Sequence, residues 1–315
     1  MAVGANIHRI GICGIGQMGA AAAVVFKRGG YEVLLWGRNP RKLEAVTTTL
    51  RELEDWMARH VGPVLQEGGV IDPVNELHRI DDQAHLVMDC IAEEMNQKVD
   101  LFQGLANARQ RGAIFITTTS GLSITEIGRR SGCAELVAGT HFWNPPHLMP
   151  LVEVIRGEDT ADSVIDQICE VVESIGKIPV RVNRDVPGFI GNRMLHALWR
   201  EAIFLVQEGI ASPEDIDKVA RLTFGLRMAV VGPLENMDLV GLDLIDTIHS
   251  YLLASLSDDS QVLPALRERT ERNQQGIKSG RGFYDWADRD ASELIERRDA
   301  QIVRQLNYLK ETGAL

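Results

Sequence analysis

A histidine and a glutamate twelve residues apart form the pair of side chains in this sequence best suited to proton transfer. His141 ends the apolar run Leu136–Thr140, and Glu153 lies inside the apolar run Leu151–Ile155. Because an unpaired buried carboxylate is costly, Glu153 needs a partner, and His141 would gain basicity and a fixed tautomer from it. The pair therefore predicts a general base that accepts a hydroxyl proton. The alternative is a structural histidine hydrogen-bonded at the end of a strand.

A glycine-rich run near the start of the chain predicts a dinucleotide site. The sequence Gly-Ile-Gly-Gln-Met-Gly follows the apolar strand pattern Ile10–Cys13 and opens a helix rich in small residues. In this position the glycines permit a tight turn, a close backbone approach to a diphosphate, and close packing of helix on sheet. The alternative is a glycine turn without a ligand. The residues predicted to hold the dinucleotide are Gly14, Gly16, Gln17, Met18 and Gly19.

The end of the second predicted strand bears on which dinucleotide binds. Many NAD-binding chains have an acidic residue there that accepts a hydrogen bond from the ribose 2′-hydroxyl. Here Gly37 and Arg38 occupy that place, and Arg41 and Lys42 follow. The arginine fork suits a 2′-phosphate, so NADP is the preferred prediction. The alternative is NAD, with Arg38 stacked on the adenine.

Alternating apolar strands and amphipathic helices must position these side chains. The rhythm predicts a Rossmann-like, doubly wound α/β domain over residues 1–184, and an all-helical domain over residues 185–315. The predicted strands are Ile10–Cys13, Glu32–Trp36, Leu86–Ile91, Ala113–Thr117, Leu136–Thr140, Leu151–Ile155 and Ile178–Val182. The predicted helices are Gln17–Lys27, Arg41–His60, Gln97–Arg109, Asp162–Ile175, Phe189–Glu208, Pro213–Arg221, Asp238–Leu256, Gln261–Gln274 and Ala291–Leu309.

Composition excludes several classes of protein. The 315 residues are 45% hydrophobic and carry a net charge of −11, which disfavours nucleic acid and anionic membranes as partners. No apolar run approaches the roughly 20 residues of a membrane span. The four cysteines form no CxxC motif, so we expect a reducing compartment and no metal site. An apolar run that begins near Ile7 leaves no room for a signal peptide, so the expected location is the cytoplasm.

Several motifs in order along the chain resemble the 3-hydroxyacyl-CoA dehydrogenase family. The matching runs are Gly14–Gly19, Thr117–Leu122, His141–Pro145, Leu151–Ile155, Asp185–Arg193, Gly232–Glu235 and Gly280–Tyr284. The resemblance implies an NAD(P)-dependent oxidoreductase that interconverts a 3-hydroxyacyl substrate and its 3-keto form. It also implies a Rossmann-like domain followed by a helical domain through which two copies form a homodimer.

The resemblance implies roles for individual residues. His141 matches the catalytic base and Glu153 its paired carboxylate. Ser120 and Asn192 match residues that bind the substrate oxygen, and both are neutral donors suited to a carbonyl that gains negative charge. Asn144 matches an asparagine that orders the site. Glu93 and Lys98 match residues beside the nicotinamide ribose; their alternative reading is a solvated helix-start acid and an exposed helical lysine.

Two departures from the family leave the substrate open between a CoA thioester and a small carboxylate. The segment of residues 44–66 carries several acids and no lysine, which suits CoA phosphates poorly. The runs Pro146–Pro150, Gly225–Pro233 and Ser292–Lys310 are similar to a branch that acts on free acids such as L-gulonate or a formyl-pyridine carboxylate. There Arg227 would anchor a carboxylate and His147 would contact substrate; their alternatives are a salt-bridged helix-end arginine and a rim histidine. The remaining alternative is a catalytically idle, crystallin-like cofactor-binding protein.

Overall fold

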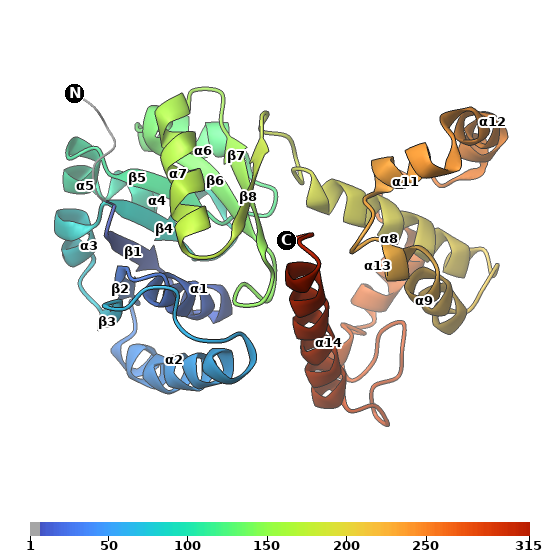
Figure 1. Ribbon diagram of the computed structural model, residues 1–315, viewed down its shortest axis with the longest axis horizontal. Coiled ribbons are helices and arrows are strands. Elements are labelled where there is room, and N and C mark those ends of the chain that lie inside the picture. Colours follow the sequence, from blue (N-terminus) through green and yellow to red (C-terminus); the bar gives the residue numbers. More distant parts are fainter. Residues whose placement is uncertain (1–6) are drawn as a thin grey trace. The chain divides into compact units, whose positions relative to one another are not determined.

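The computed structural model describes residues 7–315 and divides into two compact units, with the division between Arg193 and Met194 (Figure 1). The first unit contains an eight-stranded sheet with helices on both faces, and the second is built of helices. This arrangement confirms the predicted fold class. The predicted domain boundary near residue 184 lies shortly before this division and stays a prediction. Among the described residues, no helix has the length and apolar character needed to cross a membrane.

The sheet has the strand order β3-β2-β1-β4-β5-β6-β7-β8. Its strands are β1 (Arg9–Cys13), β2 (Glu32–Trp36), β3 (Val70–Val74), β4 (Leu86–Asp89), β5 (Ile114–Thr117), β6 (Val137–Phe142), β7 (Leu151–Arg156) and β8 (Ile178–Val182). Strands β1 to β6 are parallel, β7 is antiparallel to β6, and β8 is parallel to β7. Residues 143–150 join β6 to β7, and this link is shorter than the dozen or more residues of a parallel crossover, so the strand direction reverses. The strand order also reverses between β1 and β4, where open α/β sheets bind ligands.

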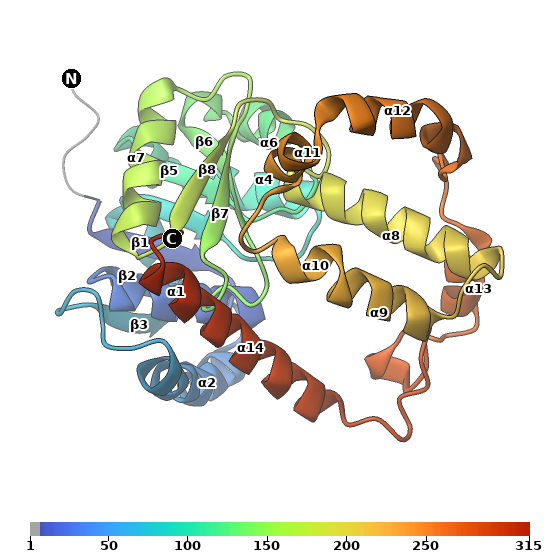
Figure 2. The same cartoon turned by 45° about the vertical axis from the view of Figure 1, so that its right-hand side comes forward.

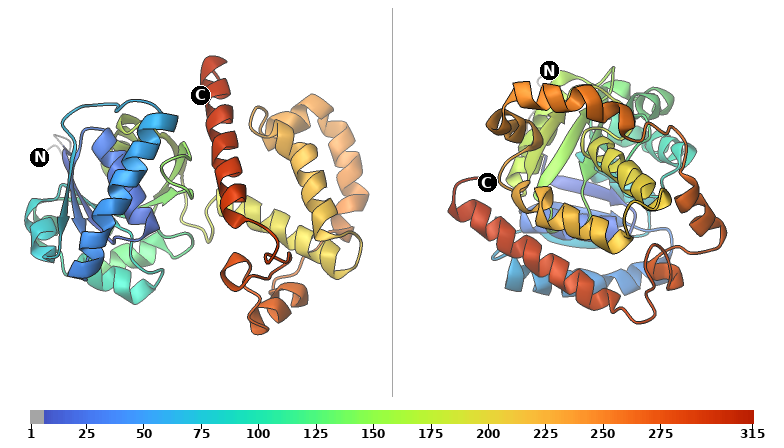
Figure 3. Two further views of the ribbon diagram at one scale, coloured as in Figure 1. Left: turned by 90° about the horizontal axis from the view of Figure 1, so that it is seen from below. Right: turned by 90° about the vertical axis from the view of Figure 1, so that its right-hand side faces the viewer.

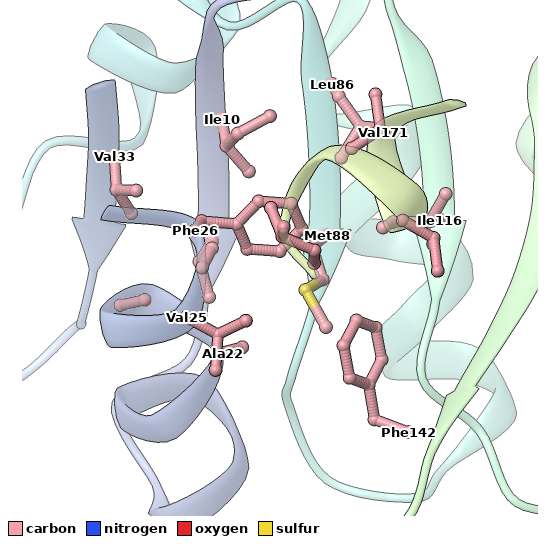
Figure 4. Close-up of a cluster of buried hydrophobic side chains, with 14 of the residues drawn as sticks. Ile10, Ala22, Val25, Phe26, Val33, Leu86, Met88, Ile116, Phe142 and Val171 are labelled. Carbon is pink, nitrogen blue, oxygen red and sulfur yellow. The ribbon is translucent and has the colours of Figure 1, made fainter. Parts of the chain in front are cut away.

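Helices cover both faces of the sheet, and alternate residues of each strand point into two separate cores. The helices of this unit are α1 (Gln17–Arg28), α2 (Pro40–His60), α3 (Leu77–Gln83), α4 (Met95–Gln103), α5 (Ala106–Gln110), α6 (Ile124–Ser131) and α7 (Asp162–Ser174), and a 3-10 turn spans Ala134–Leu136. One core contains α1, α2 and α7, and the other contains α3 to α6. Figure 4 shows part of the first, where Phe26 of α1 lies among strand residues such as Ile10 and Met88.

The sequence analysis missed one strand and merged two pairs of helices. Strand β3 contains Asp72 and Pro73 and is mostly part-exposed, because it lies at the edge of the sheet, where a proline can be accommodated. The predicted helix Gln97–Arg109 is instead the two helices α4 and α5, and Gly104 ends the first of them. Apolar periodicity continues across such breaks, so it does not reveal them.

The second unit is built of helices (Figures 2 and 3). They are α8 (Gly191–Gln207, which begins in the first unit), α9 (Pro213–Leu222), α10 (Phe224–Arg227), α11 (Pro233–Val240), α12 (Leu242–Leu252), α13 (Pro264–Glu271) and α14 (Ala291–Glu311), with 3-10 turns at Leu253–Ser255 and Ile277–Ser279. The predicted helix Asp238–Leu256 is broken at Gly241, whose φ of +106° no helix allows. Of residues 194–315, Ser257 and Leu263 alone are buried.

Candidate active site

The glycine-rich loop between β1 and α1 has the form that a diphosphate requires. Gly14 has a φ of +127°, and a Cβ there would lie 2.2 Å from the Cys90 carbonyl oxygen. A Cβ on Gly19 would lie 1.9 Å from the Gly14 carbonyl oxygen, so the helix packs closely on the loop. A Cβ on Gly16 would meet nothing within 4 Å. The helix N-terminus that follows, with Gln17 and Met18 as its first residues, has no side-chain cap and no acidic residue in its first turn. Its amides and dipole therefore fit an anionic group.

The end of β2 lies directly beside this loop. The Gly14 amide donates to the Trp36 carbonyl oxygen at 2.9 Å, and Gly37 and Arg38 follow Trp36. A Cβ on Gly37 would lie 2.9 Å from the Ile15 side chain, so the acidic residue usual in NAD-binding chains would need a rearrangement here. Arg38 and Arg41 are both exposed. The predicted basic residues are therefore beside the dinucleotide loop and open to solvent.

The antiparallel pairing of β6 and β7 brings the predicted base and its carboxylate together. His141 and Glu153 are directly opposite each other in the register, so their side chains lie on the same face. The His141 Nδ1 atom is 2.7 Å from Glu153 Oε2, and both side chains are buried. A carboxylate partner makes Nδ1 the protonated nitrogen of the neutral ring. Nε2 then carries the lone pair and can accept a proton.

The segment between β8 and α8 holds the second oxygen of Glu153. The backbone amides of Ile190 and Gly191 donate to Glu153 Oε1 at 2.9 and 3.0 Å. Burial alone would raise the pKa of Glu153, but the hydrogen bonds from His141, Gly191 and Ile190 outweigh it, and the pKa lies below its usual value. Glu153 is therefore a fully bonded carboxylate that keeps His141 in one orientation.

Aromatic side chains complete the setting of His141. The ring centroids of Trp143 and Phe189 lie 5.1 and 5.7 Å from that of His141. Phe189 has a φ of +51°, which is uncommon for a residue with a side chain. The segment is fixed at its start by Asp185, which accepts hydrogen bonds from the Ser123 hydroxyl at 2.7 Å and the Thr125 amide at 2.9 Å.

The two predicted substrate-binding residues are in direct contact. Asn192 Nδ2 donates to the Ser120 carbonyl oxygen at 3.1 Å. An amide nitrogen has two hydrogens, so Asn192 retains a second donor. Ser120 itself is exposed, at the carboxyl end of the sheet where β5 leaves it. The two residues are thus joined by a hydrogen bond, and Asn192 directly follows Ile190 and Gly191, whose amides hold Glu153.

Glu93 and Lys98 join the Ser120 loop to the sheet. Glu93 Oε1 accepts from the Ser120 amide at 2.9 Å and from the Thr119 hydroxyl, while Glu93 Oε2 is 3.6 Å from Lys98 Nζ. The alternative reading of Lys98 as an exposed helical lysine is wrong, because only 1% of its side chain is exposed. The residue that covers its charge, Asp89, was not predicted from the sequence.

Asn144 contacts the glycine-rich loop, and His147 and Arg227 have other surroundings within their own units. Gln17 Nε2 is 3.4 Å from Asn144 Oδ1, a long hydrogen bond that links the two motifs. His147 packs edge-on against Trp56 of α2, with ring centroids 5.3 Å apart. Arg227 is an exposed residue at the end of α10 in the second unit.

The sequence analysis missed the groups that act through their backbone or from the core. The amides of Ile190 and Gly191 bond Glu153, and no side-chain pattern indicates such a contact. Asp89 ends an apolar strand, as Glu153 lies within one, and the same reasoning about buried acids would have singled it out.

The sequence matches the models of one protein family and is similar to known members of it. The model of the 3-hydroxyacyl-CoA dehydrogenase NAD-binding domain matches residues 9–186, and that of the family's C-terminal domain matches residues 188–286. The 5-formyl-3-hydroxy-2-methylpyridine 4-carboxylate 5-dehydrogenase of Mesorhizobium japonicum is 34% identical over 94% of this chain and 96% of its own length. A probable 3-hydroxybutyryl-CoA dehydrogenase of Bacillus subtilis is 35% identical over 90% of this chain and 99% of its own.

Solved structures give the same result. A crystal structure of the formyl-pyridine carboxylate 5-dehydrogenase, described as an NAD+-dependent dismutase, has a TM-score of 0.91 and 32% identity, and covers 97% of this chain and 99% of that one. The (S)-3-hydroxybutyryl-CoA dehydrogenase of Ralstonia eutropha has a TM-score of 0.72 and 26% identity, over 90% and 100% of the two chains. This protein belongs to the 3-hydroxyacyl-CoA dehydrogenase family and is an NAD-binding dehydrogenase.

Proposed function

We propose that this dehydrogenase uses His141 as the general base that takes the proton of a substrate hydroxyl while a hydride leaves the same carbon. The observation that carries the proposal is the 2.7 Å contact between His141 Nδ1 and Glu153 Oε2. It keeps the proton on Nδ1, so the lone pair of Nε2 is available to accept the hydroxyl proton. In the reverse direction the same nitrogen, protonated, returns the proton to the oxygen.

Ser120 and Asn192 serve the substrate oxygen in this proposal. Both offer neutral donors, which stabilise the negative charge that develops on a carbonyl without competing for the proton. The Asn192 contact with the Ser120 carbonyl oxygen keeps the two donors together. When NAD is bound, its nicotinamide supplies the hydride acceptor. The loop Gly14–Gly19 would hold its diphosphate, and Glu93 with Lys98 would lie at its nicotinamide ribose.

We infer that the substrate is a small carboxylate rather than a CoA thioester. Support comes from the segment of residues 44–66, whose acids are Glu44, Glu52, Glu54 and Asp55 against Arg51 and Arg59 as fixed cations. This balance opposes the phosphates of CoA. The similarity to a dehydrogenase of a pyridine carboxylate over nearly the whole chain adds support. Arg227 is the proposed anchor for the substrate carboxylate, and His147 is proposed to contact the substrate.

The proposed activity is tested by turnover with defined substrates. Purified protein is assayed for NADH and NADPH oxidation with acetoacetyl-CoA, small 3-keto acids and formyl-substituted aromatic carboxylates. We expect turnover of a small carboxylate, and a loss of about 1,000-fold or more in kcat for His141→Ala with NADH binding retained. Turnover of His141→Ala close to that of the wild type would refute the role of His141. Efficient reduction of acetoacetyl-CoA would refute the choice of substrate class.

A preference for NADP over NAD stays a prediction, supported by the absence of an acid at Gly37 and by Arg38 and Arg41 beside the dinucleotide loop. If these arginines bind a 2′-phosphate, Arg38→Ala raises KM for NADPH by about tenfold and changes KM for NADH little. The description of a similar enzyme as NAD+-dependent favours the opposite outcome. A wild-type kcat/KM tenfold higher for NADH would refute the preference.

We further propose that the protein is a homodimer through its helical unit and resides in the cytoplasm. Support for the dimer comes from the large apolar side chains that this unit exposes, among them Leu226, Leu234 and Leu239, each more than 70% exposed. Large exposed apolar side chains in such number are typical of a subunit interface. Support for the cytoplasm comes from the four free cysteines.

A further inference from the structure

A buried ion pair lies at the point where the strand order of the sheet reverses. Asp89 is the last residue of β4, which pairs with both β1 and β5, and Lys98 lies on α4. Lys98 Nζ contacts Asp89 Oδ1, and the exposed fractions of the two side chains are 1% and 0%. Asp89 takes no part in the proposed proton and hydride transfer.

The two charges depend on each other because both are removed from water. Burial raises the pKa of the Asp89 carboxyl, and the Lys98 ammonium opposes that rise. Without Asp89, Lys98 would be a buried cation whose remaining acidic partner among residues 7–315 is the more distant Glu93, and loss of one member of a buried ion pair is strongly destabilising. The Lys98 ammonium is therefore held in place by its contact with Asp89.

The pair is poorly explained as a device for stability. Asp89 Oδ2 is buried and makes no hydrogen bond of good geometry among residues 7–315, although the neighbouring Thr117 hydroxyl lowers the pKa of this carboxyl. A buried pair with an unsatisfied oxygen is often less stabilising than well-packed apolar side chains of similar volume. Because apolar side chains of similar volume often stabilise a core at least as well, the charges point to what Lys98 contacts next.

From Lys98 a continuous set of contacts leads to the substrate-binding residues. Lys98 Nζ is 3.6 Å from Glu93 Oε2, and the other oxygen of Glu93 accepts from the Ser120 amide at 2.9 Å. The Ser120 carbonyl oxygen in turn accepts from Asn192 at 3.1 Å. Glu93 is about half exposed, so its orientation depends on these partners rather than on packing. A shift of Lys98 would therefore reach both Glu93 and the Ser120 loop.

We propose that Asp89 is a positioning residue, which holds Lys98 as the charged group that orients Glu93 and thereby couples cofactor binding to the geometry of the Ser120 loop. The inference rests on the proposed function, because Glu93 is taken to bind the nicotinamide ribose and Ser120 the substrate oxygen. Asp89 touches neither ligand in this proposal and acts through Lys98.

The test removes both charges of the Asp89–Lys98 pair and asks whether the effect depends on the carboxylate of Glu93. Because Asp89→Asn alone leaves an unpaired buried lysine and can unfold the protein, the main variant is Asp89→Asn/Lys98→Gln, which removes both charges. It is examined in the wild-type background and in a Glu93→Gln background. The readouts are Kd for NADH by fluorescence titration, which needs no substrate, together with KM for the cofactor and kcat. Asp166→Asn, which breaks the half-exposed 2.7 Å ion pair with Arg181, is the matched control.

We expect the neutral pair to raise Kd for NADH by about tenfold and to raise KM for the cofactor more than it lowers kcat. In the Glu93→Gln background the neutral pair should add less than about twofold, because members of one network are not additive. Asp166→Asn should leave all three quantities unchanged. A neutral pair that lowers only Tm, or one whose effect on Kd is the same with and without Glu93→Gln, would overturn the proposal.

The failure of this inference is distinguishable from failure of the proposed function. The Kd measurements do not depend on turnover, on the identity of the substrate or on the role of His141. If His141→Ala retained full turnover while the neutral pair weakened NADH binding only when Glu93 is intact, the base would be wrong and the positioning role of Asp89 would stand. The converse result would leave His141 in place and remove Asp89.

Discussion

The chemistry of the site depends on which nitrogen of His141 carries the proton. A neutral imidazole accepts a proton on one nitrogen only, and the carboxylate of Glu153 at 2.7 Å keeps the existing proton on Nδ1. Glu153 can do this because its other oxygen is bonded to two backbone amides. The base and its partner are thus fixed by three hydrogen bonds: the one between them, and two from the backbone amides to Glu153.

Replacing the Glu153 carboxylate by an amide tests this dependence. Glu153→Gln keeps the size of the side chain but supplies no charge to favour Nδ1–H, so we expect kcat to fall by about 100-fold while Kd for NADH changes little. The measurement is steady-state kinetics together with NADH titration. Glu173→Gln, an exposed acid at the end of α7, is the control and should behave as the wild type. Equal losses in kcat and cofactor binding would indicate general disruption instead.

The same carboxylate should make stability depend on pH. The pKa of Glu153 is lower in the folded protein than in the unfolded chain, since hydrogen bonds from His141, Gly191 and Ile190 outweigh burial. Its contribution is present above the unfolded pKa, about 4.3, and is lost as pH falls through the folded value. Urea midpoints of wild type and Glu153→Gln should therefore differ most near neutral pH, and the difference should shrink as pH falls below the unfolded pKa and through the lower folded pKa. A difference that is constant with pH would contradict this cause.

At the scale of elements, three segments far apart in the sequence meet around one carboxylate. The hairpin of β6 and β7 sets His141 opposite Glu153, and the segment Asp185–Asn192 closes over them from the start of α8. This segment fits because Gly191 has no side chain. A Cβ at that position would lie 2.2 Å from the Trp143 ring. Glycine here permits the close approach that brings two amides to Glu153.

Gly191→Ala should therefore weaken catalysis through the backbone. The new methyl group pushes the segment away from Trp143, so we expect kcat to fall by about tenfold or more with little change in NADH affinity. Trp143→Leu makes room, and in that background Gly191→Ala should have a much smaller effect on kcat. The four proteins are compared by steady-state kinetics and NADH titration. An equal effect in both backgrounds would exclude the contact with Trp143 as the cause.

At the scale of the whole molecule, the two units differ in how their apolar residues are covered. The first buries two layers of apolar side chains, one on each face of the sheet. The second buries Ser257 and Leu263 alone, while leucines on α10, α11 and α12 are exposed. So small a core is typical of a unit that buries further apolar surface against a partner. The homodimer proposed above supplies one.

Sedimentation or light scattering should therefore report twice the monomer mass. Placing charges on exposed leucines, as in Leu234→Glu/Leu239→Glu, should shift the equilibrium toward monomer and make Tm lower and dependent on concentration. Thr48→Glu, on an exposed position of α2 in the first unit, is the control and should leave the mass unchanged. A wild-type protein that is monomeric at all concentrations would remove the proposal.

The sequence by itself determined the features whose causes are local. Strand and helix periodicity predicted seven of the strands, because buried parallel strands are short apolar runs between amphipathic helices. The glycine-rich loop was recognisable because its three glycines serve backbone geometry at fixed spacing. Glu153 stood out because an acid in an apolar run needs a partner, and His141 lies twelve residues earlier, at the end of another apolar run.

Tertiary structure alone decided what depends on contacts between distant segments. Strand β3 lacks an apolar pattern because it lies at the edge of the sheet and has a neighbouring strand on one side alone. Its pairing with β2 defines it as a strand. The amides of Ile190 and Gly191 become ligands of Glu153 only through the turn at Gly188 and Phe189, where φ is positive. From the sequence, Lys98 could equally have been an exposed lysine on a helix. In the structure, α4 buries it in contact with Asp89. The behaviour of a charged side chain depends on which groups are buried beside it, and the fold decides those neighbours, not the spacing of residues along the chain.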